Sequence, residues 1–240
     1  MSLRWKFWLV TLVSLLAVVI TLALGRWQLS RAGQKIAWQA RIDAQAALPP
    51  LSGQALLSLA DPASELQRQV DLRGRWIASG TVFLDNRQMN SKPGLYVVTP
   101  LRLEGGSAVV LVQRGWVARN FVDRKSLAKV ETPDDVVEIQ GRIAAPPSRL
   151  YQFGAAESGL IRQNLDLAQF AAELGLPLLP VSVQQTGAAS EGLLREWPPV
   201  SVGVETHYGY AFQWFALSAL IAILYVWFQI VRRFFPPRRS

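Results

Sequence analysis

Two uncharged apolar runs near the ends of the chain limit its possible folds more than any other feature. The first covers residues 7–25 and the second covers residues 208–231. As helices rising 1.5 Å per residue they would reach about 28 Å and about 36 Å, and the hydrocarbon core of a bilayer is about 30 Å thick. Apolar runs of this length are typical of membrane spans. We therefore predict an integral membrane protein with one transmembrane helix at each end.

The first run also admits a second interpretation, a cleaved signal peptide. Ala23-Leu24-Gly25 would serve as a small-residue cleavage site. The run is longer than the usual core of a signal peptide, however, and Arg26 follows it at once. A retained anchor is therefore the favoured interpretation.

Basic residues predict the orientation. Four Arg follow the second run, whereas Glu205 and His207 lie just before it. The positive-inside rule places the C-terminus in the cytoplasm, and Arg4 and Lys6 agree for the N-terminus. The short N-terminus leaves no room for a mitochondrial transit peptide, so we expect a bacterial inner membrane and a periplasmic middle. The expected divisions are a cytoplasmic N-terminus (1–6), a first transmembrane helix (7–25), an extracytoplasmic domain (26–207), a second transmembrane helix (208–231) and a cytoplasmic basic tail (232–240).

The charge distribution argues against a nucleic-acid partner. All 17 Asp and Glu lie between the two runs, together with 19 of the 25 Lys and Arg. The sequence pI of about 10.3 therefore reflects the membrane flanks. The chain has no Cys, one His and two Met, so disulfides, thiol chemistry and a self-sufficient copper or zinc site are excluded.

The middle of the chain predicts an α+β domain with a mainly antiparallel sheet of about six strands, closed toward a barrel. Helix-friendly sequence continues from Arg26 to Ala47, either without a break or resuming after Gly33, and Pro49-Pro50 ends it. A helix over residues 165–174 has Asn164 as its expected cap, and 196–199 is expected to be a stiff linker. The expected strands are 70–76, 81–84, 95–103, 108–112, 137–143 and 181–184.

The sequence contains no recognisable catalytic constellation. G-x-S-x-G, the P-loop pattern and G-x-G-x-x-G are all absent. Asp85 and Asp134-Asp135 are interpreted as solvated surface carboxylates. We expect that the chain is not an enzyme.

His207 stands at the start of the second span and is the main candidate site residue. Helical spacing places it on one face with Tyr210, Ala211 and Trp214. An imidazole at this position could be an axial haem ligand, or an interfacial residue that caps the helix. Gln213, within the apolar span, is expected to need a polar partner in this chain or on another helix.

Several short motifs occur in an ordered series along the chain. Gly25-Arg26-Trp27-Gln28 follows the first span, and Asn86-Arg87, Gly94 and Thr99-Pro100-Leu101 lie in the central strands. Arg114-Gly115-Trp116-Val117 and the closing run from His207 to Phe215 complete the series. Together they resemble the Surfeit locus protein 1 family over nearly the whole chain, with Gln113 where many members carry Asn.

The resemblance implies an assembly factor, or chaperone, for cytochrome c oxidase that binds haem a and helps its insertion into the large catalytic subunit. It implies His207 as the ligand of the haem iron, with Tyr210, Trp214, Trp27 and Gln28 beside the haem. The implied partners are the large oxidase subunit and the enzyme that synthesises haem a. One His per chain implies transient holding, or a second axial ligand from a partner chain, another copy or water. The alternatives are a scaffold that stabilises oxidase subunits without haem and an extracytoplasmic sensor.

Overall fold

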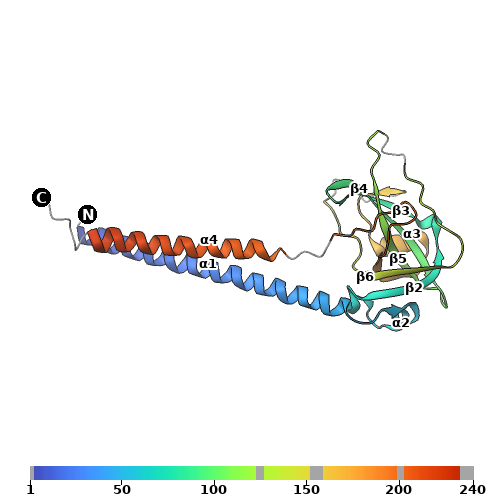
Figure 1. Cartoon of the computed structure of the whole chain (residues 1–240), viewed down its shortest axis with the longest axis horizontal. Coiled ribbons are helices and arrows are strands. Elements are labelled where there is room, and N and C mark those ends of the chain that lie inside the picture. The colour runs from blue at the N-terminus through green and yellow to red at the C-terminus, as the bar shows by residue number, and fades with distance from the viewer. Residues whose placement is uncertain (1–2, 123–126, 152–158, 199–202, 233–240) are drawn as a thin grey trace. The chain divides into compact units, whose positions relative to one another are not determined.

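The computed structural model describes residues 3–122, 127–151, 159–198 and 203–232. The chain divides into two compact units, one formed by residues 1–41 with 200–240 and the other by residues 42–199. The first unit is a pair of helices and the second is a strand-rich domain (Figure 1). Most of the expected basic tail lies outside the described residues.

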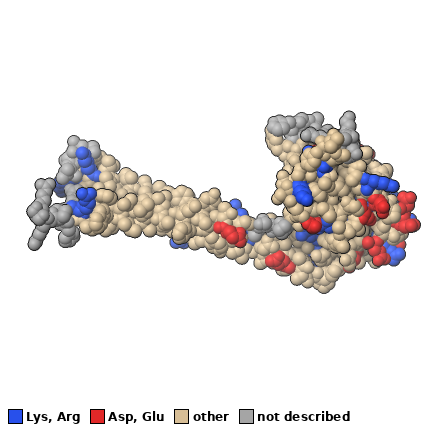
Figure 2. All heavy atoms as spheres, turned by 45° about the horizontal axis from the view of Figure 1, so that its top comes forward, with Lys and Arg blue, Asp and Glu red and all other residues tan. Residues whose placement is uncertain are grey.

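The helix pair consists of α1 (Leu3–Ala46) and α4 (Val204–Tyr225), which continues into a π-helical turn, η3 (Val226–Val231). Both helices are long and apolar enough to cross a membrane. Helix α1 runs without interruption through Gly33 and ends before Pro49-Pro50, which confirms the first of the two expected alternatives. The helix contains two glycines, Gly25 and Gly33. Each costs only about 1 kcal/mol against Ala, so neither breaks a helix of 44 residues. Figure 2 shows that the surface of the pair carries no charge over much of its length.

The two helices pack antiparallel, because Thr11 near the start of α1 contacts Tyr225 near the end of α4. The less exposed positions on each helix recur at alternating intervals of three and four residues, the spacing of a coiled-coil seam. On α1 they are Thr11, Ser14, Val18, Thr21, Gly25, Gln28 and Ala32, and on α4 they are His207, Ala211, Trp214, Ser218, Ile221 and Tyr225. Many of these side chains are small, which permits close packing within a membrane.

The domain is built on a closed, barrel-like sheet of five strands: β2 (Gln69–Trp76), β4 (Lys92–Leu103), β5 (Val109–Ala118), β6 (Val137–Ala144) and β8 (Leu178–Gln185). Their order is β2-β6-β8-β5-β4, and a further pairing of β2 with β4 closes the ring. Only β5 and β8 pair in parallel within it. Inward side chains such as Leu72, Leu101 and Val183 form the main core.

Shorter elements extend and cover this barrel. Strand β3 (Val82–Met89) pairs with β4 and carries the two-residue β7 (Ile161–Arg162), and β1 (Leu51–Ser52) pairs with β2. Helix α2 (Gly53–Ser58) and the 3₁₀ turns η1 (Pro62–Glu65) and η2 (Ala78–Gly80) fill the connections. Helix α3 (Leu167–Leu174) buries Phe170 against Leu84 and Val98.

Two local predictions are wrong, the cap of α3 and the ends of two strands. Asp166 caps α3 by accepting a hydrogen bond from the Gln169 N–H, whereas Asn164 pairs with the backbone of Leu150. Trp197, in the expected stiff linker 196–199, is held by the domain, because its ring packs 5.0 Å from that of Tyr96 and its indole N–H donates to Gln185 O. Strands β3 and β5 run about five residues further than expected.

Candidate functional site

A hydrogen bond joins the side chains of His207 and Gln28 across the helix pair. Nδ1 of His207 lies 2.7 Å from Oε1 of Gln28, and Gln28 is only 9 % exposed. A carbonyl oxygen only accepts, so Nδ1 carries the proton in this arrangement. The lone pair of the neutral ring then resides on Nε2, where it can bind a metal.

Small residues on both helices allow this contact. Gly25 lies almost one turn before Gln28, and a β-carbon there would come within 2.6 Å of the Phe215 ring. Ala32 follows Gln28 by one turn, Ala211 follows His207 by one turn, and both are buried. Because the backbones of the two helices approach closely, the side chain of Gln28 is long enough to contact the imidazole of His207.

The other three expected site residues lie differently. Trp214 is half-buried on the seam, as its spacing of seven residues from His207 predicts. Tyr210 is 49 % exposed and Trp27 is 54 % exposed. The structure therefore brings Gln28 and His207 together and leaves the rings of Tyr210 and Trp27 on the outer surface of the pair.

Within the described residues, His207 is the candidate donor for a haem iron. No group of three or more His, Cys, Asp or Glu side chains gathers there that could hold a metal ion. Met89 is the last residue of β3 and is only 1 % exposed. Its sulfur is enclosed by the domain and is not available as a ligand. On the helix pair, His207 is thus the residue that would supply a nitrogen to a haem iron, with Gln28 holding its ring.

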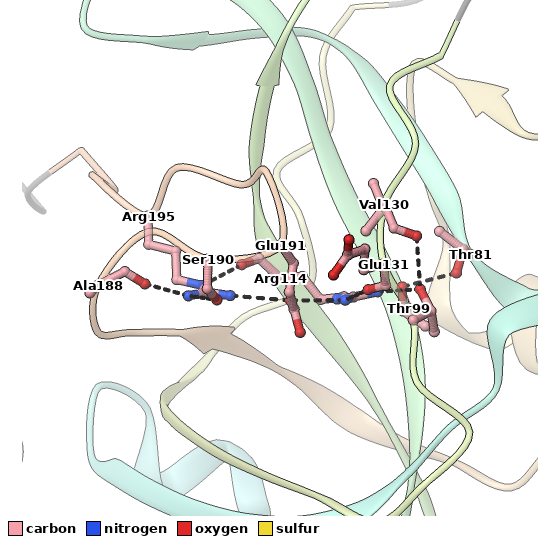
Figure 3. Close-up of polar contacts among 10 residues, drawn as sticks. Thr81, Thr99, Arg114, Val130, Glu131, Ala188, Ser190, Glu191 and Arg195 are labelled. Atoms are coloured by element: carbon pink, nitrogen blue, oxygen red, sulfur yellow. Dashed lines mark hydrogen bonds and ion pairs between the residues drawn. The ribbon is translucent and has the colours of Figure 1, made fainter.

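A second polar cluster, which the sequence did not predict, lies inside the domain (Figure 3). The side chain of Arg114 is fully buried. It donates to Thr132 Oγ1 at 2.8 Å, to Glu131 O at 2.5 Å and to Glu191 Oε2 at 2.9 Å. Its guanidinium also lies 4.6 Å from the ring of Trp76.

Arg195 extends this cluster from the C-terminal segment of the domain. It donates to Arg114 O, Ala188 O and Ser190 Oγ, and its carboxylate partner is again Glu191. Burial lowers the pKa of Arg195, and the nearby Glu191 carboxylate opposes that shift. These contacts hold the segment from residue 188 to 195 against β5, so the role of the cluster is structural.

The two residues after Arg114 complete this attachment. A β-carbon at Gly115 would lie 2.7 Å from Leu193 Cβ and from Leu194 O, and Trp116 exchanges backbone hydrogen bonds with Leu194. The indole of Trp116 lies over Gly94 and donates to Arg87 O at 3.0 Å. The Arg-Gly-Trp motif therefore has a packing explanation and needs no ligand.

Asp85 and Asp134, both interpreted from the sequence as surface carboxylates, do not form an acid–base pair. Asp85 is paired with Arg119, and the backbone carbonyl of Asp134 accepts from Arg75 Nη1 at 2.9 Å. A surface pocket of about 530 Å³ beside α3 is lined mainly by Pro, Leu and Ala, and its charged side chains, Arg149 and Asp166, pair with each other. Neither arrangement supplies a nucleophile together with a base.

Comparison with known proteins gives one consistent result. The model of the SURF1 family (the Surfeit locus protein 1 family) matches residues 15–219. A SURF1-like protein of Drosophila melanogaster is 27 % identical over 239 residues, covering 91 % of this chain and 77 % of the relative. A SURF1-like protein of Rickettsia felis is 28 % identical over 227 residues, covering 90 % of this chain and 94 % of the relative.

Proposed function

This chain belongs to the SURF1 family, and we propose that it is a non-enzymatic assembly factor for cytochrome c oxidase that holds haem a for the large catalytic subunit. The observation that carries this proposal is the hydrogen bond from His207 Nδ1–H to Gln28 Oε1. With Nδ1 used in this hydrogen bond, Nε2 is the ring nitrogen left to bind a metal, at the end of an apolar helix pair. Haem a has an iron that accepts such a nitrogen and an apolar tail suited to a membrane.

Each residue has a separate task in this proposal. His207 would supply the axial nitrogen, and Gln28 would fix the ring tautomer and its orientation. The half-buried Trp214 offers an apolar wall on the same seam. The exposed rings of Tyr210 and Trp27 would cover a haem that lies against the outside of the pair. One axial ligand per chain favours transient holding, with any second ligand coming from a partner chain, another copy or water.

The proposed location is the bacterial inner membrane, with both termini in the cytoplasm and the domain in the periplasm. Two helices long enough to span a bilayer support the membrane part, and the basic ends support the orientation. The proposed partners are the large oxidase subunit, which receives the haem, and the enzyme that makes haem a. His207 would then lie at the periplasmic end of α4, where its neighbours leave the bilayer.

The test is the haem content of purified variants. The wild type, His207→Ala and Thr206→Ala are expressed in cells that make haem a, and the absorbance of each is recorded after purification. Thr206 is the matched control, because it is the neighbouring, exposed residue. Loss of haem from His207→Ala with retention in Thr206→Ala supports the proposal, and equal haem in all three overturns it.

The alternative is a membrane scaffold that stabilises oxidase subunits without binding haem. The exposed apolar side chains around Gln213 on α4, such as Phe212 and Leu217, favour this function as a second candidate. Under this alternative the large subunit co-purifies with wild type and His207→Ala alike, and neither sample contains haem. If the wild type contains haem and His207→Ala does not, a haem-free scaffold is not the whole function of the chain.

A further inference from the structure

Gln213 lies inside the membrane-spanning part of α4, and no residue that the structure describes is its hydrogen-bond partner. Its side chain is exposed, and within the described ranges no hydrogen bond or ion pair satisfies its amide. The apolar helix Val204–Val231 has 28 residues, a length of about 42 Å. If it is centred on a core of about 30 Å, Gln213 lies about 7 Å inside the hydrocarbon, where lipid tails offer no hydrogen bond.

The face that carries Gln213 is not the one that packs on α1. Gly209, Gln213, Ala216, Leu220 and Ile223 recur at intervals of four and three residues and are all exposed. The seam toward α1 includes His207, Ala211 and Trp214. Ala211 lies two positions before Gln213, and two positions correspond to about 200° of rotation around the helix axis. Helix α4 therefore has a second, nearly opposite surface with the spacing of a helix–helix contact.

The residues around Gln213 permit a close approach of another helix. A β-carbon at Gly209 would meet nothing within 4 Å, and Ala216 adds only a methyl group. Leu220 is 51 % exposed and Ile223 is 63 % exposed further along the same face. Small residues beside the amide and larger ones beyond it suit two helices that approach at the level of Gln213.

From these observations we propose that a second copy of this chain packs on this face of α4 and that the two Gln213 side chains hydrogen-bond to each other. A two-fold axis along the membrane normal places identical residues at the same depth. A primary amide has both a donor and an acceptor, so two of them satisfy one another. The contact with α1 and the His207–Gln28 pair stay intact in such a dimer, so it does not depend on haem binding.

Disulfide cross-linking tests the proposal directly, because the natural chain has no cysteine. The full-length variants Gln213→Cys and Ala219→Cys are oxidised in native membranes. Ala219 is the matched control, since it is exposed on the same helix but lies about 120° away from Gln213. A disulfide-linked homodimer of Gln213→Cys, with little from Ala219→Cys, is the expected result. Equal yields from both variants, or cross-links from Gln213→Cys only to another protein, overturn the proposal.

A second measurement separates the contribution of the Gln213 amide to the dimer from that of the surrounding helix face. The dimer dissociation constant in a bilayer is compared for the wild type, Gln213→Leu and Gln213→Asn. Removing an interhelical hydrogen bond is expected to weaken the dimer about three- to tenfold in Gln213→Leu, whereas Gln213→Asn, which keeps an amide, stays nearer the wild type. An unchanged or tighter dimer in Gln213→Leu contradicts the amide pairing.

Discussion

The ring of Phe215 occupies the space that a side chain on Gly25 would need. A β-carbon placed on Gly25 would lie 2.6 Å from Cε1 of Phe215 and 2.8 Å from its Cζ. The two residues lie on opposite helices, one before Gln28 and one after His207. Their contact sets the spacing of α1 and α4 at the level of the candidate site.

Gly25→Val is therefore expected to push the helices apart. Overpacking of this kind costs about 1–3 kcal/mol. Gly33→Val is the control, since a β-carbon at Gly33 would meet nothing within 4 Å, and both changes place Val in the same helix. Cysteines introduced at Thr11 and Tyr225, which contact each other, report the spacing through a short bis-maleimide. Cross-linking should fall in Gly25→Val alone and recover when Phe215→Ala is added.

Gln28→Leu is expected to weaken haem binding if the proposed function is correct. The change keeps the size of the side chain and removes the acceptor for His207 Nδ1–H, and loss of such a partner typically lowers metal affinity about 10- to 100-fold. A haem titration followed by absorbance gives the affinity. Leu29→Ala, on the exposed neighbouring position, should bind as the wild type does. Equal affinity in Gln28→Leu would show that Gln28 does not position the imidazole.

Arg114→Met is expected to destabilise the domain strongly. The side chain is fully buried and bonded to three acceptors, and removing one partner of a buried ion pair costs about 3–5 kcal/mol. Arg73→Met is the comparison, because Arg73 pairs with Glu104 while 60 % exposed and should cost under about 1 kcal/mol. Urea unfolding of the full-length proteins in detergent, followed by tryptophan fluorescence, measures both. Equal losses would contradict the role assigned to the cluster.

The stability of the domain is expected to fall in acid partly through Glu173. Hydrogen bonds from Arg162 lower the pKa of this carboxyl below its ordinary value of about 4.5, and partial burial opposes the shift. A group with a lowered folded-state pKa stabilises the fold above its unfolded pKa, and the contribution is lost as pH falls through the folded value. In Glu173→Gln the decline of Tm below about pH 4.5 should be shallower. Glu138→Gln, at an exposed position, serves as control. If Tm falls in acid as steeply in Glu173→Gln as in the wild type, Glu173 does not contribute to the acid sensitivity.

Much of the architecture could be predicted because the patterns are strong and local. The alternation of Val70, Leu72 and Trp76 with polar residues gives the buried face of β2, and the length of the two apolar runs gives the helices. The ends of the strands were harder to predict from the sequence. Asn86 has φ of +58° at a bulge in β3, so the strand continues through polar residues that resemble a turn. Leu150 and Asn164 are fourteen positions apart in the chain, and only the tertiary fold brings them together.

The candidate site was predictable in part for the same reason. Helical spacing alone places Trp214 on the same face as His207. It does not show which of Tyr210 and Ala211 faces α1 and which is exposed, because that depends on where α1 packs. Gln28 faces His207 only because of the register between the two helices, and the two residues are 179 positions apart in the sequence. Residues 26–28 lie next to each other in the chain, yet their side chains point in different directions, so only one of them reaches the imidazole.

The position of β8 in the barrel has a consequence for biosynthesis. It joins β5 to β6, and the following segment pairs Leu194 with Trp116. The ring therefore cannot close until nearly 200 residues have left the ribosome, well after α1 has been made. The nascent chain must be kept from aggregating through most of its synthesis, with its open sheet edges unpaired. The last helix to be synthesised, α4, then pairs with the first.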